Sequence, residues 1–150
     1  MSKMWRIAVI MVAALVLLLG FGTQPARAEE IRCIGTLGAI TVDNVLVPEG
    51  KTCTLNKTRV QGTVQVARNA TLYAKTARIN GHVQAENAKL VSVTANTTVG
   101  GSIQAFENTG GVVIKGNRVD GNLQCKSNIP APTGGGNIVQ GNKEDQCARL

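Results

Sequence analysis

One five-residue phrase recurs about every twenty positions, and this repeat restricts the fold more than any other feature of the chain. Each copy opens with glycine and ends with an apolar residue, glutamine and a second apolar or small residue. The four full copies span residues 62–66, 81–85, 101–105 and 121–125, at spacings of 19, 20 and 20. Gly141 opens a fifth copy, and Asp43 stands in the glycine position of an upstream one. A fixed period of this length is typical of solenoids, in which each repeat packs on its neighbours.

Apolar residues alternate within each copy, which predicts a strand with one buried face. The alternation begins just before the first full copy, where its positions are Val60, Gly62, Val64 and Val66. A second apolar pair recurs later in each repeat, for example Leu72 with Ala74, so we expect at least two short strands per repeat. The glycine marks either a bend between strand segments or a close approach of facing sheets.

Repeats of about twenty residues with strands and no helical period favour an all-β fold, a single-stack parallel β-helix of about five coils. Equivalent residues then stack about 4.8 Å apart along the axis. The general crossover preference favours a right-handed helix, although solenoids of both hands exist. We expect the proline- and glycine-rich residues 129–136 to replace the second strand of the last coil. A leucine-rich repeat has a similar period, but its leucine pattern is missing, and a short β-sandwich remains the alternative.

The first 28 residues have the composition of a secretory signal peptide. Lys3 and Arg6 precede an apolar run at residues 7–22, and a small-residue site follows at 26–28. The run is shorter than the ~20 residues that a membrane-spanning helix needs, so a retained anchor is the weaker alternative. We expect cleavage after Ala28, a single domain over residues 29–150, no membrane span after cleavage, and a secreted or periplasmic protein.

Four cysteines follow this leader: Cys33, Cys53, Cys125 and Cys147. Export favours disulfides, and the spacings are not those of a zinc site. The first two are 20 residues apart and the last two are 22 apart, so each pair is separated by about one coil. Cys53 and Cys125 would lie roughly 17 Å apart along the axis, beyond the ~7 Å that a disulfide tolerates. We therefore predict the pairs Cys33–Cys53 and Cys125–Cys147, one at each end of the stack.

Stacking turns repeated residues into columns, and two of these columns are amides. The first faces outward and contains Gln65, Gln84, Gln104 and Gln124. Its amides can bond to one another from coil to coil, or they can present a flat polar face to a glycan. The second recurs at a turn and contains Asn69, Asn87, Asn108 and Asn128. We expect this asparagine ladder to be structural, because asparagine side chains satisfy the backbone groups of turns.

Two further columns carry groups that could bind or react. Arg59, Arg78 and Arg118 each precede an inward Val or Ile, with Thr98 interrupting the column. They could bind phosphate, sulfate or uronate groups of an anionic polymer, or form a solvated edge that keeps molecules apart. A fourth column places His82 beside Ser102, the residue types of a nucleophilic pair. Because the alternation places no acidic residue beside that histidine, we predict no catalytic residue.

Composition narrows the choice of partners. Of 16 Lys and Arg, three precede Glu29, which leaves 13 against 9 acidic residues and only a mild basic excess. Tyr73 and Phe106 are the only aromatic residues after the leader, which argues against stacking platforms for sugars or single-stranded nucleic acid. The chain has one histidine, so metal sites are not expected. We expect no metal, no cofactor, no nucleic-acid partner, and a monomer.

With its glycine-led strands and asparagine column, the chain resembles an uncharacterised group of small secreted bacterial proteins with a right-handed parallel β-helix. The likeness covers about residues 33–147 and includes the closing segment from 121 to 147. It carries no catalytic motif, so it implies a fold rather than an activity. Larger β-helix enzymes, such as pectate lyases and polygalacturonases, also have asparagine ladders. They differ in having more coils, long loops around a cleft, and clustered Asp, Arg or Lys.

We therefore expect an exported, non-enzymatic structural or binding module of the cell envelope or extracellular space. Its expected partner is a polysaccharide, anionic or neutral. The alternative is a small polysaccharide-active lyase or hydrolase on a β-helix. The hypothesis that the protein binds ice or a mineral surface is less favoured, because the outward residues are not a repeated Thr-x-Thr pair. A filament of β-helix units is disfavoured by the leader and by the disulfide-linked ends.

Overall fold

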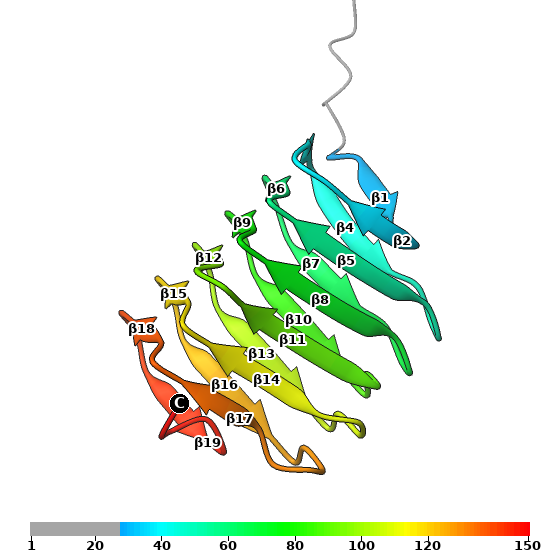
Figure 1. Cartoon of the computed structure of the whole chain (residues 1–150). Helices are drawn as coiled ribbons and strands as arrows, with labels where there is room; N and C mark the ends of the chain where they lie inside the picture. Colours follow the sequence, from blue (N-terminus) through cyan, green and yellow to red (C-terminus); the bar gives the residue numbers. More distant parts are fainter. Residues whose placement is uncertain (1–27) are drawn as a thin grey trace, which may run out of the picture.

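The computed structural model describes residues 28–150, which form nineteen strands and no helix. The strands build three parallel sheets around one apolar core (Figure 1). Each strand pairs with the strand three places along the chain, as in a continuous coil. This confirms the predicted parallel β-solenoid and excludes a β-sandwich. The expected leader, except for Ala28, lies outside the described residues.

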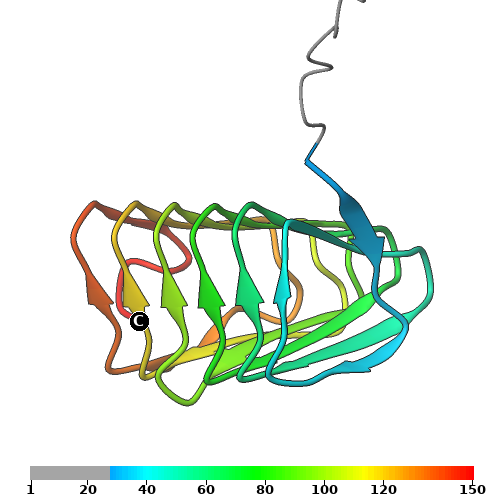
Figure 2. The ribbon, with the colours of Figure 1, turned by 90° about the horizontal axis from the view of Figure 1, so that it is seen from above.

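Each turn of the chain supplies one strand to each sheet. Sheet A contains β1 (Glu30–Arg32), β4 (Asn44–Val47), β7 (Val64–Val66), β10 (Val83–Glu86), β13 (Ile103–Phe106), β16 (Leu123–Lys126) and β19 (Lys143–Asp145). Sheet B contains β2 (Gly35–Leu37), β5 (Thr52–Asn56), β8 (Thr71–Lys75), β11 (Leu90–Thr94), β14 (Val112–Lys115) and β17 (Thr133–Gly135). Sheet C contains β3 (Thr41–Val42), β6 (Arg59–Val60), β9 (Arg78–Ile79), β12 (Thr98–Val99), β15 (Arg118–Val119) and β18 (Ile138–Val139). In Figure 2 equivalent strands stand in a row along the axis.

The solenoid has about six turns of about 19 residues, one turn more than the sequence repeat predicts. The additional turn is the first, which is short. Glu30 pairs with Asn44, only 14 positions later, whereas Val64 pairs with Val83, 19 positions later. Because this first turn lacks the glycine-led phrase, comparing the sequence with itself does not reveal it.

The core is a stack of aliphatic side chains in register from coil to coil. In sheet A, successive levels are filled by Val64, Val83, Ile103 and Leu123, all fully buried. Complete burial of an aliphatic side chain is worth about 2 kcal/mol, so a column of them stabilises the stack along its whole length. The apolar residues that the alternation predicted to face inward therefore form the interior of the solenoid.

The glycine that opens each phrase lies where the chain turns from sheet C into sheet A. A Cβ at Gly81 would lie 2.5 Å from the carbonyl oxygen of Gly62 on the preceding coil. A Cβ at Gly101 would lie 2.6 Å from Nδ1 of His82. The close approach is thus between successive coils and not between facing sheets. The glycine also lies at a bend, so the alternating run from Val60 to Val66 spans two strands, β6 and β7, rather than one, and each coil has three strands.

The prediction that residues 129–136 replace the second strand of the last coil is wrong. Thr133–Gly135 forms β17, which pairs with β14 at the edge of sheet B. Gly134 explains the fit, because a Cβ at this position would overlap the carbonyl oxygen of Ile114. Glycine therefore allows a short strand to follow the two prolines.

Two disulfides join neighbouring coils near the two ends of the stack. Cys33 is bonded to Cys53 and Cys125 to Cys147, with Cα–Cα distances of 5.5 Å and 5.3 Å. Both predicted pairings are confirmed. Among residues 28–150 there is no helix long and apolar enough to cross a membrane.

Candidate functional site

Six exposed cationic side chains follow the corner between sheets B and C, here termed the basic edge. They are Lys57, Arg59, Lys75, Arg78, Lys115 and Arg118. The arginines form the column expected from the sequence: Arg59 is in register with Arg78, and Arg118 follows two coils later. Because coils repeat every ~4.8 Å, these charges lie one or two coil spacings apart along the solenoid.

The lysines form a second column parallel to the first, which the sequence analysis did not single out. Lys75 and Lys115 end strands of sheet B, two coils apart, with Thr94 between them. The arginine column is interrupted at the same coil, where Thr98 stands between Arg78 and Arg118. Both columns therefore have a short hydroxyl side chain at one shared level.

This interruption leaves a shallow depression of about 250 Å³ on the outer face of sheet C. It is lined by Thr98 and Gly100, by Arg78 and Arg118 one coil to either side of Thr98, and by the acidic Asp120. A guanidinium group can donate two parallel hydrogen bonds to a carboxylate or sulfate. An anionic group in the depression would meet Arg78 directly and would compete with Asp120 for Arg118.

The basic edge has little opposing charge. The sequence from Gly50 to Ala85 contains no acidic residue, although it supplies four of the six cations. The one ion pair within residues 28–150 joins Nε of Arg118 to Oδ1 of Asp120 at 3.1 Å. Both side chains are about half exposed, so the pair contributes at most ~1 kcal/mol. Arg118 is thus partly neutralised, whereas the other five cations form no ion pair within residues 28–150.

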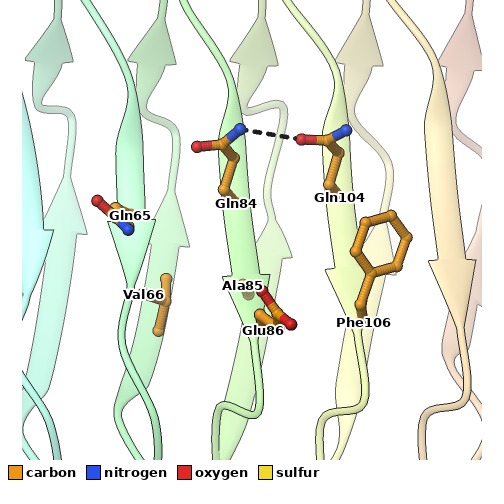
Figure 3. Close-up of a pocket in the computed structure, with 7 residues that line it drawn as sticks. All are labelled: Gln65, Val66, Gln84, Ala85, Glu86, Gln104 and Phe106. Atoms are coloured by element: carbon orange, nitrogen blue, oxygen red, sulfur yellow. Dashed lines mark hydrogen bonds between the residues drawn. The ribbon is translucent and has the colours of Figure 1, made fainter.

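The glutamine column lies on the outer face of sheet A. Nε2 of Gln84 donates to Oε1 of Gln104 at 3.0 Å (Figure 3), and Nε2 of Gln104 donates to Oε1 of Gln124 at 3.0 Å. Nε2 of Gln124 donates to Oε2 of Glu144 at 2.8 Å, so these four residues form what we term the glutamine ladder. Gln65 shares the register of Gln84 but lies outside this chain of hydrogen bonds.

The expected asparagine column is wrong in part, because its members occupy two different positions of the turn between sheets A and B. Asn108 and Asn128 are buried. Oδ1 of Asn108 accepts from the backbone N–H of Ala88 at 2.8 Å, and its Nδ2 donates to the carbonyl of Ala85 at 3.3 Å. Asn128 repeats this arrangement one coil later and bonds Asn108 itself.

Asn69 and Asn87 lie one position earlier in the turn than the buried pair. They have φ values of 56° and 55°, a left-handed conformation that asparagine tolerates better than most residues. Alanine fills the buried position of these two coils, as Ala70 and Ala88. Small shifts of sequence spacing at the turn therefore changed which asparagines face inward.

A second inner polar column lies at the turn between sheets B and C and was missed from the sequence. Nδ2 of Asn117 donates to the carbonyl of Val93 at 2.7 Å, and Oδ1 of Asn137 accepts from the backbone N–H of Asn117 at 3.0 Å. The sequence does contain a pattern for this column, because small or polar residues recur at spacings of 19, 20, 20 and 20. These residues are Thr58, Ala77, Thr97, Asn117 and Asn137.

His82 and Ser102 are neighbours, as expected, but both serve as acceptors for backbone groups. Nδ1 of His82 accepts from the backbone N–H of Ser102 at 2.9 Å. Oγ of Ser102 accepts from the backbone N–H of Asn122 at 2.9 Å. A neutral imidazole that accepts at Nδ1 carries its proton on Nε2. The column thus holds successive coils together, and the serine hydroxyl does not donate to the histidine, as an activated nucleophile would.

Comparisons with known proteins return no matching protein-family model, curated protein or solved structure. The fold itself defines the class to which the chain belongs. It is a parallel β-solenoid of about six turns with two disulfides near its ends.

Proposed function

We propose that the protein is an exported, non-enzymatic binding module that attaches to anionic polysaccharide of a bacterial envelope or extracellular matrix. The observation that carries this proposal is the basic edge. It sets cations one or two coil spacings apart along the solenoid, with a depression flanked by Arg78 and Arg118. A linear polymer with recurring carboxylate or sulfate groups matches such an array, because both are periodic.

The two disulfides support the exported location. Cystine bridges persist in oxidising compartments and are rare in the cytosol. The expected leader over residues 1–28 supports the same location. The right-handed bacterial β-helix proteins that the chain resembles are secreted and small as well.

The non-enzymatic part of the proposal is supported by the roles of His82 and Ser102, the candidate nucleophilic pair. His82 and Ser102 each accept a hydrogen bond from the next coil and lie on an open face. An acyl-transfer site needs donors that stabilise an oxyanion in a place from which water is excluded.

The test measures binding of polygalacturonate and a sulfated glycan to the oxidised protein at low and high salt. A variant carrying Arg59→Gln, Arg78→Gln and Arg118→Gln is compared with a control carrying Arg68→Gln, Lys89→Gln and Arg149→Gln. Both variants lose three charges, but only the first changes the basic edge. We expect the first to lose about tenfold or more in affinity, and the control to lose much less.

Binding should weaken in high salt, because exposed charges are screened. Equal losses in the two variants would mean that net charge, and not the basic edge, attracts the polymer. Analysis of the same samples for shortened chains addresses the enzyme alternative. A shortened polymer would replace the binding proposal by a lyase or hydrolase.

A further inference from the structure

The outer face of sheet A carries two adjoining depressions, separate from the basic edge. One, of about 210 Å³, is lined by residues that include Gln84, Gln104, Glu86 and Phe106 (Figure 3). The other, of about 350 Å³, lies at the ends of the same strands and is lined by Glu86, Phe106, Glu107 and Lys126. The two depressions share the carboxylate and the phenyl ring, so they form one continuous surface.

The glutamine ladder gives this surface a fixed hydrogen-bonding polarity. A carboxylate only accepts hydrogen bonds, so Glu144 requires the amide nitrogen of Gln124 to point toward it. That orientation passes along the ladder and turns every amide nitrogen toward Glu144. Oε1 of Gln84 is then the free end of the ladder and an exposed acceptor on the side of the Gln65 coil (Figure 3).

Phe106 adds an apolar plane beside these acceptors. It is one of two aromatic residues after the expected leader, and it is partly exposed. Its register partners are Glu86 on one side and Lys126 on the other, each one coil away. An aromatic ring flanked by acceptors and a donor is complementary to a sugar ring, whose C–H face is apolar and whose rim carries hydroxyls.

We propose that this surface binds an uncharged saccharide unit of a glycan. The ring of Phe106 packs on the C–H face of the sugar. Gln84 and Glu86 accept hydrogen bonds from its hydroxyls, and the remaining amide N–H groups of the ladder donate to its oxygens. Low aromatic content argues against a platform of several rings, but a single ring beside an oriented amide ladder is enough for one sugar. This site goes beyond the basic edge in its residues, its face of the solenoid and its ligand.

The test uses unbranched tetrasaccharides of glucose and of N-acetylglucosamine as probes, with the oxidised, isotope-labelled protein observed by NMR. We expect saturable changes of the side-chain amide signals of Gln84 and Gln104 with at least one probe. We expect these changes to be unaffected by salt, because no net charge is bound. Phe106→Ala should weaken binding about tenfold, whereas Tyr73→Ala, the matched aromatic control on sheet B, should not weaken it.

Phe106→Leu removes the aromatic ring but keeps an apolar side chain, so it tests the ring itself in a variant whose folding is less disturbed. Its binding should fall as that of Phe106→Ala does. The variant with three arginines of the basic edge replaced should bind the tetrasaccharides as the wild type does, so this test is independent of the anion proposal. The saccharide site is overturned if neither probe shifts the ladder amides, or if Phe106→Leu binds both probes with wild-type affinity.

Discussion

Backbone carbonyl oxygens of the preceding coil leave little room for a side chain at the glycine that opens each repeat. The carbonyl oxygen of Gly62 lies 2.5 Å from where a Cβ of residue 81 would be, and it belongs to the backbone, so it cannot rotate away. We predict that Gly81→Ala destabilises the protein by about 1–3 kcal/mol, the usual range for overpacking. Gly38→Ala is the control, because a Cβ at Gly38 meets no atom within 4 Å. Denaturant unfolding of both variants measures the difference, and equal midpoints would contradict this account of the glycine column.

Residue-scale features that depend on a repeat could be predicted from the sequence, and those that depend on turn length could not. Alternation placed the glutamines outward and the valines inward because strands have a period of two. Asn87 and Asn108 have the same residue type near the same turn, yet only Asn108 is buried. One residue more or fewer in a turn decides this, and sequence spacing does not show where the extra residue is accommodated.

At the scale of strands and coils, the disulfides hold the two terminal coils to the stack. A solenoid coil contacts only its neighbours, so an end coil opens more easily than an inner one. Replacing Cys125 and Cys147 by alanine should cost about 3 kcal/mol, the chain-entropy value for loops of this length. Amide hydrogen exchange should accelerate first in β19 and leave β10 protected. The matched removal of Cys33 and Cys53 should instead loosen β1 and β2, and uniform acceleration along the stack would contradict local attachment.

At the same scale, the sequence predicted most of the coils but not every strand within them. The glycine-led phrase identified five coils, but the first coil has no such phrase and was not counted. Sheet C strands are only two residues long, for example Arg59–Val60, so their alternation is too short to separate them from the following strand. The sequence therefore predicted at least two strands per coil without resolving the third. The cysteine pairing needed only the coil length, which is why it was correct.

For the whole molecule, the central claim is that function lies in columns along the rod and not in a cleft within one coil. Thr98 gives a direct test, because it occupies the level of the arginine column between Arg78 and Arg118 and carries no charge. Thr98→Arg completes the arginine column. Thr109→Arg adds the same charge at an exposed position in the turn between sheets A and B. The two variants have equal net charge and differ only in where the added charge lies.

The measurement is the affinity of these two variants for polygalacturonate, with the wild type, over a range of salt concentrations. An added exposed ion pair is worth up to ~1 kcal/mol, so Thr98→Arg should bind about two- to fivefold more tightly, with a steeper salt dependence. Thr109→Arg should bind with nearly wild-type affinity. An equal gain in both variants, or no gain from Thr98→Arg, would contradict the account of a binding column on the basic edge.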